Sequence, residues 1–113
     1  MGNNIINLKK DGNSYISCLG EINSSEYLKN ISIKSMSISP KFISIRRSES
    51  GDAVVISKEF LGEYLIYKVT INGNTLRIRT DINNLLNNGD KCCLSINKNS
   101  YCFLYPGAFK EYI

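Results

Sequence analysis

Two arginines separated by one residue are the clearest candidates for ligand chemistry in this sequence. Arg77 and Arg79 alternate with Leu76 and Ile78, so in a strand both guanidinium groups project from the face opposite the apolar one. Tyr64 precedes them and could lie on the same face of a neighbouring strand. Cations interleaved with an aromatic ring are typical of single-strand nucleic-acid binders. The same cations could contact a small anion, or the face could simply be solvated.

Composition argues against nucleic acid as the partner. Fourteen basic and ten acidic residues give a net charge of +4, well short of the dense cationic field of a dedicated binder. Stacking surfaces also need several exposed rings, whereas Tyr67, Phe60 and Phe103 occupy positions expected to face the core. We therefore do not expect nucleic acid to be the partner.

The four cysteines predict structural thiols. Cys18, Cys92, Cys93 and Cys102 form no C-x-x-C pair, so neither a zinc knuckle nor a thioredoxin-type motif is present in the sequence. We expect reduced, buried thiols and no metal site. Because neighbouring residues of a strand point to opposite faces, one of Cys92 and Cys93 should be in the core and the other exposed or at an interface.

Catalysis is not expected of this chain. The sequence contains no histidine, which removes the commonest general base and the commonest metal ligand. It contains no Gly-Lys pair and therefore no phosphate loop, and neither the dinucleotide-binding nor the nucleophile-elbow glycine pattern occurs. We expect no catalytic residues and no cofactor in this chain.

The elements that would position these residues are short strands. Apolar and polar residues alternate from Tyr64 to Ile71, and Asn72-Gly73 follows, the strongest short signal for a hairpin turn. Leu76 and Ile78 then define the apolar face of the returning strand. This hairpin is the clearest local prediction.

Similar runs recur along the whole chain. The stretches Asn4 to Leu8 and Tyr15 to Leu19 are expected to form a second hairpin, and Ala53 to Phe60 another strand. Helical pattern is limited to one turn near Ser24 to Leu28 and one or two turns within Asp81 to Asn88. About seven to nine short antiparallel strands predict an all-β fold, a sandwich or a small barrel. No linker divides residues 1–113, which we treat as one domain of cytosolic type.

Turn and core residues between 35 and 106 resemble a known family. The residues that carry the resemblance are Pro40, Gly51, Leu61, Gly62, Asn72, Gly73, Gly89 and Asp90. Their order is similar to that of the TOBE-type domain at the C-terminal end of ATP-binding subunits of bacterial ABC importers. Cys93 stands where that family usually has valine, and Ser39-Pro40-Lys41 replaces its Arg-Pro-Glu.

The resemblance implies an OB-like β-barrel, with residues 1–34 as preceding strands of the same barrel. It implies a non-catalytic regulatory and dimerisation domain, whose partners are its own ATPase domain, a second copy of the subunit and, through the parent, membrane permease subunits. ATP and Mg would belong to that longer parent, at the cytoplasmic face of the cell membrane. Cys93, Phe109 and Tyr112 are the candidate interface residues. The alternatives are a module for a small, molybdate-like oxyanion and an oligonucleotide-binding OB barrel.

Overall fold

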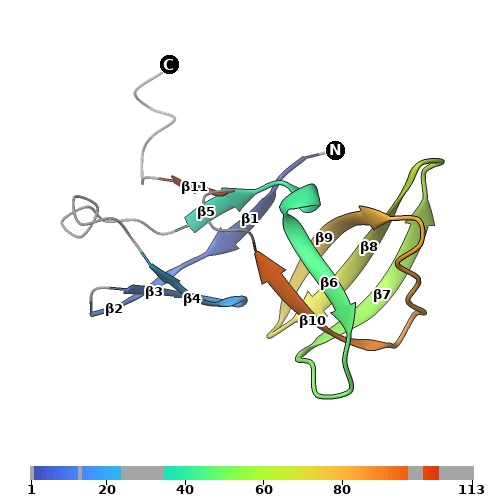
Figure 1. The fold of residues 1–113 in the computed structure, drawn as a ribbon. Coiled ribbons are helices and arrows are strands. Elements are labelled where there is room, and N and C mark those ends of the chain that lie inside the picture. The colour runs from blue at the N-terminus through green and yellow to red at the C-terminus, as the bar shows by residue number, and fades with distance from the viewer. Residues whose placement is uncertain (1, 13, 24–34, 97–100, 105–113) are drawn as a thin grey trace.

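A computed structural model of the chain describes residues 2–12, 14–23, 35–96 and 101–104 (Figure 1). In these ranges the regular elements are eleven strands and one 3-10 turn, η2 (Pro40–Phe42). The strands pair antiparallel into three sheets. The predicted all-β class is confirmed. The strand number exceeds the expected seven to nine partly because four short strands, rather than two, lie before residue 24.

The largest sheet has five strands and carries most of the core. Its members are β6 (Ile43–Arg47), β7 (Ala53–Phe60), β8 (Tyr64–Ile71), β9 (Asn74–Asp81) and β10 (Lys91–Ile96). They lie in the order β6-β10-β7-β8-β9, so β10, the last of these five strands along the chain, lies between β6 and β7. The sheet curls until β9 approaches β6 (Figure 1). Within the described ranges no ladder joins those two strands, so the curl is compatible with a small OB-like fold without closing a barrel.

The β8–β9 hairpin forms as predicted. Tyr64 pairs with Asp81 at one end and Ile71 with Asn74 at the other. Asn72 and Gly73 make the turn with φ of 47° and 79°, the doubly left-handed conformation that matches the twist of a two-residue hairpin. Asparagine and glycine tolerate this conformation at low steric cost, so the turn fixes which residues face the core.

A β-bulge bends β7 in its middle. Val55 pairs with Val69 and Ser57 with Lys68, which leaves Ile56 without a ladder partner. Every residue of β7 after Val55 is exposed. Phe60 is therefore 63% exposed, and the prediction that it faces the core is wrong. The side chain of Phe103 lies outside the described residues.

Two smaller sheets lie beside the five-stranded sheet (Figure 1). One contains β1 (Asn4–Asn7), β5 (Ser35–Ile38) and β11 (Tyr101–Leu104), with β5 in the centre. The other is the meander β2 (Lys9–Asp11), β3 (Ser14–Ser17) and β4 (Gly20–Asn23). The N-terminal strands therefore share no ladder with the five-stranded sheet in the described ranges.

The expected hairpin between Asn4 to Leu8 and Tyr15 to Leu19 forms with a different partner. The turn at Gly12 joins β3 to β2, whereas β1 pairs with β5, more than 25 residues later in the chain. A turn signal gives the position of the reversal, but it does not say how far the preceding strand continues. Here the strand is interrupted at Leu8, and only the three residues after it pair with β3.

One hydrophobic cluster joins all three sheets. Ile6 of β1, Tyr15 of β3, Ile22 of β4 and Met36 of β5 belong to the same buried group as the inward residues of the five-stranded sheet. Tyr67, fully buried, lies within this group, as predicted. The described residues between 2 and 23 thus share a core with β5–β10, although they share no sheet with β6–β10.

The Tyr67 hydroxyl holds the connection between β9 and β10. It donates to the Asn84 carbonyl at 2.8 Å and accepts from the Leu86 backbone N–H at 2.7 Å. Asp81 caps a simple turn, because its carboxylate accepts from the Asn83 N–H at 2.8 Å and its carbonyl from the Asn84 N–H at 3.0 Å. The helical turns expected in this segment do not form, since backbone groups that a helix ladder needs are bonded to Tyr67.

The helical turn expected near Ser24 to Leu28 falls outside the described residues. Among the residues that the structure does describe, no helix is long and apolar enough to cross a membrane.

Candidate binding surfaces

The outward face of β7, β8 and β9, called here the outer face, brings polar side chains into cross-strand rows. Ser57, Lys68 and Arg77 form one row, because Lys68 pairs with Ser57 on one side and with Arg77 on the other. Glu59, Ile66 and Arg79 form the next row. Arg77 and Arg79 do share this face, as the alternation predicts.

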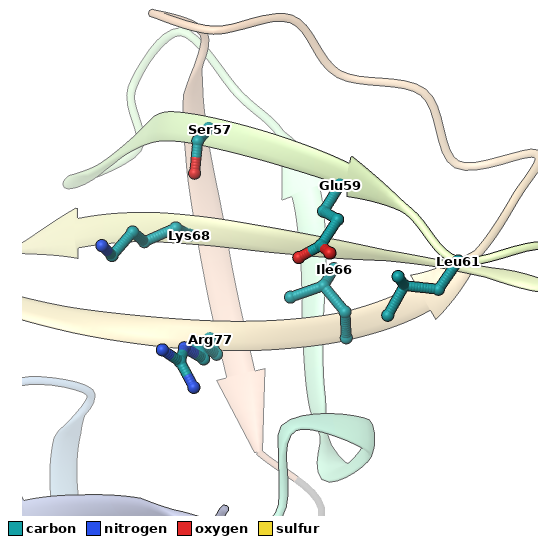
Figure 2. Close-up of a pocket in the computed structure, with 6 residues that line it drawn as sticks. All are labelled: Ser57, Glu59, Leu61, Ile66, Lys68 and Arg77. Atoms are coloured by element: carbon teal, nitrogen blue, oxygen red, sulfur yellow. The ribbon is translucent and has the colours of Figure 1, made fainter. Parts of the chain in front are cut away.

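The middle of the outer face is hollowed over an apolar floor (Figure 2). The hollow has a volume of about 400 Å³, and Ile66 at its floor is only 5% exposed. Glu59 hangs over Ile66 beside Leu61, whereas Lys68 and Arg77 both extend away from them (Figure 2). The hollow therefore has an acidic, apolar end and a basic end.

Arg79 does not stand free on this face. Its guanidinium lies 3.8 Å from the centre of the Tyr64 ring, a cation–π distance. The two side chains line a further hollow of about 340 Å³ together with Lys41, Glu63, Thr80 and Asp81. The sequence placed Tyr64 near the arginines, and the structure pairs it with Arg79. One face of the ring is thereby covered and is not available to stack on a base.

A third hollow lies where β1 meets the outer face. It measures about 310 Å³ and is lined by residues 2–5 on one side and by Lys68, Thr75 and Arg77 on the other. The Asn4 side chain fixes this wall: its amide donates to the Arg77 carbonyl at 2.7 Å and accepts from the Arg77 N–H at 2.9 Å. The Asn4 amide thus bonds the Arg77 backbone as a neighbouring strand would, and it satisfies two backbone groups on the edge of β9. The sequence analysis missed Asn4, because only the tertiary fold brings β1 to this edge.

Three thiols gather around a hollow of about 270 Å³ between the β3–β4 turn and β10. Cys18, Cys92 and Cys93 line it, and all three are free cysteines. Cys92 is buried and Cys93 half-buried, so the prediction of opposite faces is confirmed. Burial, with the nearby Cys93 and Asp90, raises the pKa of Cys92 to about 11, and burial also raises the pKa of Cys18. Neither is a thiolate nucleophile near neutral pH. The described residues include no group of three ligands that could hold a metal ion.

The predicted turn residues lie at chain reversals around the five-stranded sheet. Pro40 opens η2 and is buried, while Leu61 and Gly62 form the β7–β8 turn. Gly51 approaches β10 so closely that a Cβ on it would collide with the Cys92 carbonyl. Gly89 and Asp90 bond both backbone groups of Val55. The Gly89 N–H donates to the Val55 carbonyl at 2.7 Å, and the Val55 N–H donates to the Asp90 carbonyl at 3.0 Å.

Apolar side chains are exposed at the end of the sheet where β7 and β9 finish. Phe60 and Leu61 lie at the β7–β8 turn, and Ile82 and Leu85 in the segment after β9. The Tyr64–Asp81 pair brings these two segments to the same end (Figure 1). We call these four residues the end patch. The candidate interface residue Cys93 lies in the thiol hollow instead, and Phe109 and Tyr112 lie outside the described residues.

No family model and no curated protein matches the chain.

Proposed function

We propose that the chain is a non-catalytic association domain that pairs with a second copy of itself through the end patch. The observation that carries this proposal is the exposure of large apolar side chains there, with Phe60 63% and Leu85 70% exposed. Large apolar side chains that are exposed together at one end of a sheet are typical of an interaction site. A two-fold pairing would bury the same patch on both copies.

The residue types of the end patch favour a protein partner over a small ligand. Phenylalanine and leucine form the apolar centres of protein interfaces, while charged side chains occupy their rims. Glu63 and Asp81 flank the patch and are exposed, as a rim requires. Burying the patch would offset the solvent exposure that the bulge in β7 creates.

The regulatory setting of the proposal rests on the resemblance to TOBE-type domains of ABC importer ATP-binding subunits. What supports it is that the turn residues of the resemblance act together around one sheet. Gly51 needs its missing side chain beside β10, and Gly89-Asp90 joins the entry of β10 to β7. In that setting the domain would bias the association of two ATPase halves while the catalytic groups, ATP and Mg belong to the longer parent.

The association is tested by sedimentation of the 113-residue chain over a range of concentrations. We expect a concentration-dependent dimer, and we expect Leu85→Lys to abolish it because a charge would be buried against the partner. Ile16→Lys is the matched control, since Ile16 is also an exposed apolar residue but lies on β3, away from the end patch. A wild-type chain that stays monomeric at high concentration would exclude the dimer.

The transporter setting has a separate test. The mass of the native polypeptide in cells, together with the DNA upstream of Met1, shows whether an ATPase domain with a phosphate loop precedes this chain. An in-frame extension with that loop would support the setting. A native product of 113 residues would favour a free-standing binding module.

A further inference from the structure

Two cations face each other on the outer face without a counter-charge. Lys68 and Arg77 are direct cross-strand partners, an arrangement in which like charges are destabilising. Among the residues that the structure describes, neither side chain has an ion-pair or hydrogen-bond partner. Both point away from Glu59, the acid on the neighbouring row (Figure 2). Sheet stability alone therefore does not explain this pair.

The hollow beside β1 offers Lys68 and Arg77 a polar site in which they could share an anion. Lys68 and Arg77 line it with Thr75 and with residues 2–5, and none of these side chains is acidic. The Asn4 amide bonds both the N–H and the carbonyl of Arg77, so β1 is held as a fixed wall, and no side chain among the described residues binds the Arg77 guanidinium. The walls and both cations are thus in place without a ligand.

We propose that this hollow binds a phosphate-type oxyanion between Lys68 and Arg77. A guanidinium presents a planar fork of N–H donors to two oxygens of such a group, and an ammonium adds a compact positive charge. The Thr75 hydroxyl supplies a third donor. The anion could be free in solution or be the terminal phosphate of a small molecule, since both offer the same oxygens.

The rest of the outer face favours a compact anion over an oligonucleotide. Arg79 covers one face of Tyr64, so the aromatic ring closest to the arginines is not an open stacking platform. Glu59, Glu63 and Asp81 line the two neighbouring hollows and would repel a phosphate chain that continued along the strands. Of these three hollows, the one beside β1 is the one lined by cations without an acidic side chain.

The test is calorimetric titration of the full chain with inorganic phosphate and with ADP, in chloride buffer of constant ionic strength. Lys68→Met and Arg77→Met should each weaken binding by about tenfold or more, as loss of a charge-assisted hydrogen bond predicts. Arg79→Gln is the matched control, because it removes a cation from the same face and strand but not from this hollow; its affinity should stay within about twofold of the wild type. Arg77→Lys should retain part of the binding, since the charge stays and the fork is lost.

The unliganded variants separate a binding role from a structural one. Lys68→Met should melt no lower than the wild type, because it removes a like-charge contact. Absence of binding by both phosphate and ADP overturns the proposal, as does binding that survives in both methionine variants. Binding of an oligothymidylate of about 15 nucleotides without binding of phosphate or ADP would also overturn it, in favour of a polyanion surface. The end-patch dimer is read by sedimentation and does not depend on these outcomes.

Discussion

The Tyr67 hydroxyl fixes the nine-residue connection between β9 and β10 on the surface of the core. Its ring is fully buried, and its oxygen serves both the Asn84 carbonyl and the Leu86 N–H. Replacing Tyr67 with phenylalanine keeps the ring but leaves the buried Leu86 N–H without this acceptor. We expect Tyr67→Phe to lower the free energy of unfolding by about 1–3 kcal/mol.

Urea unfolding measures this loss, as a lower midpoint with an unchanged slope. Tyr64→Phe is the control, because Tyr64 is half-buried and its hydroxyl has no hydrogen-bond partner among the described residues. It should change stability by no more than about 0.5 kcal/mol. Equal effects of the two substitutions would mean that the Tyr67 hydroxyl does not hold the connection.

Single residues also show which structural roles a sequence can reveal and which it does not. Gly51 belongs to a motif that is visible in the sequence. The reason that glycine is needed there is visible only in the fold, where the Cys92 carbonyl occupies the position of a Cβ. Arg77 and Arg79 are equivalent by alternation. Only the register of β8 separates them, because it places Arg77 opposite Lys68 and lets Arg79 reach the Tyr64 ring.

At the level of elements, β1 is joined to the five-stranded sheet through a side chain. The Asn4 amide makes two hydrogen bonds with the Arg77 backbone, and β1 has no ladder with β9 in the described ranges. Removing the amide leaves two backbone groups on the β9 edge to water. We expect Asn4→Ala to cost about 1–2 kcal/mol of stability and to speed hydrogen exchange at the Arg77 amide.

Amide exchange followed by NMR tests this expectation residue by residue. Asn3→Ala serves for comparison, since Asn3 is exposed and, among the described residues, its amide bonds only the Ser37 hydroxyl, at 2.9 Å. It should leave exchange at Arg77 unchanged. Unaltered exchange at Arg77 in Asn4→Ala would show that the amide does not protect this edge.

Local elements were predictable where short-range chemistry determines them. Asn72-Gly73 and the alternation around it were enough to predict β8, β9 and their turn. The partner of β1 was not predictable, because β5 lies far along the chain and no local signal selects it. The bulge at Ile56 was missed as well, although the sequence contains a signal for it. The alternation of apolar and polar residues is interrupted where Ile56 directly follows Val55, and the residues after them no longer face the core.

For the whole molecule, the shared core predicts one cooperative unit. Ile22 of β4 and Ile78 of β9 belong to different sheets but to the same hydrophobic cluster. The domain boundary was a sequence inference from the absence of a linker. The cluster gives it a physical basis, because the two small sheets bury their apolar residues in the same cluster as the five-stranded sheet.

Ile22→Val and Ile78→Val should therefore each destabilise a single transition, by about 0.5–1.5 kcal/mol. Far-UV circular dichroism reports all three sheets, and NMR intensities of β3 and β8 amides report them separately; the curves should coincide in both variants. Independent folding of the sheet β2-β3-β4 would give a different result. Ile22→Val would then shift only the β3 signals and leave the β8 midpoint in place. If the β3 and β8 midpoints instead shift together, the hollow beside β1 and the end patch belong to one folding unit. A ligand bound beside β1 would then stabilise the folded state of the whole unit, including the segments that carry the end patch.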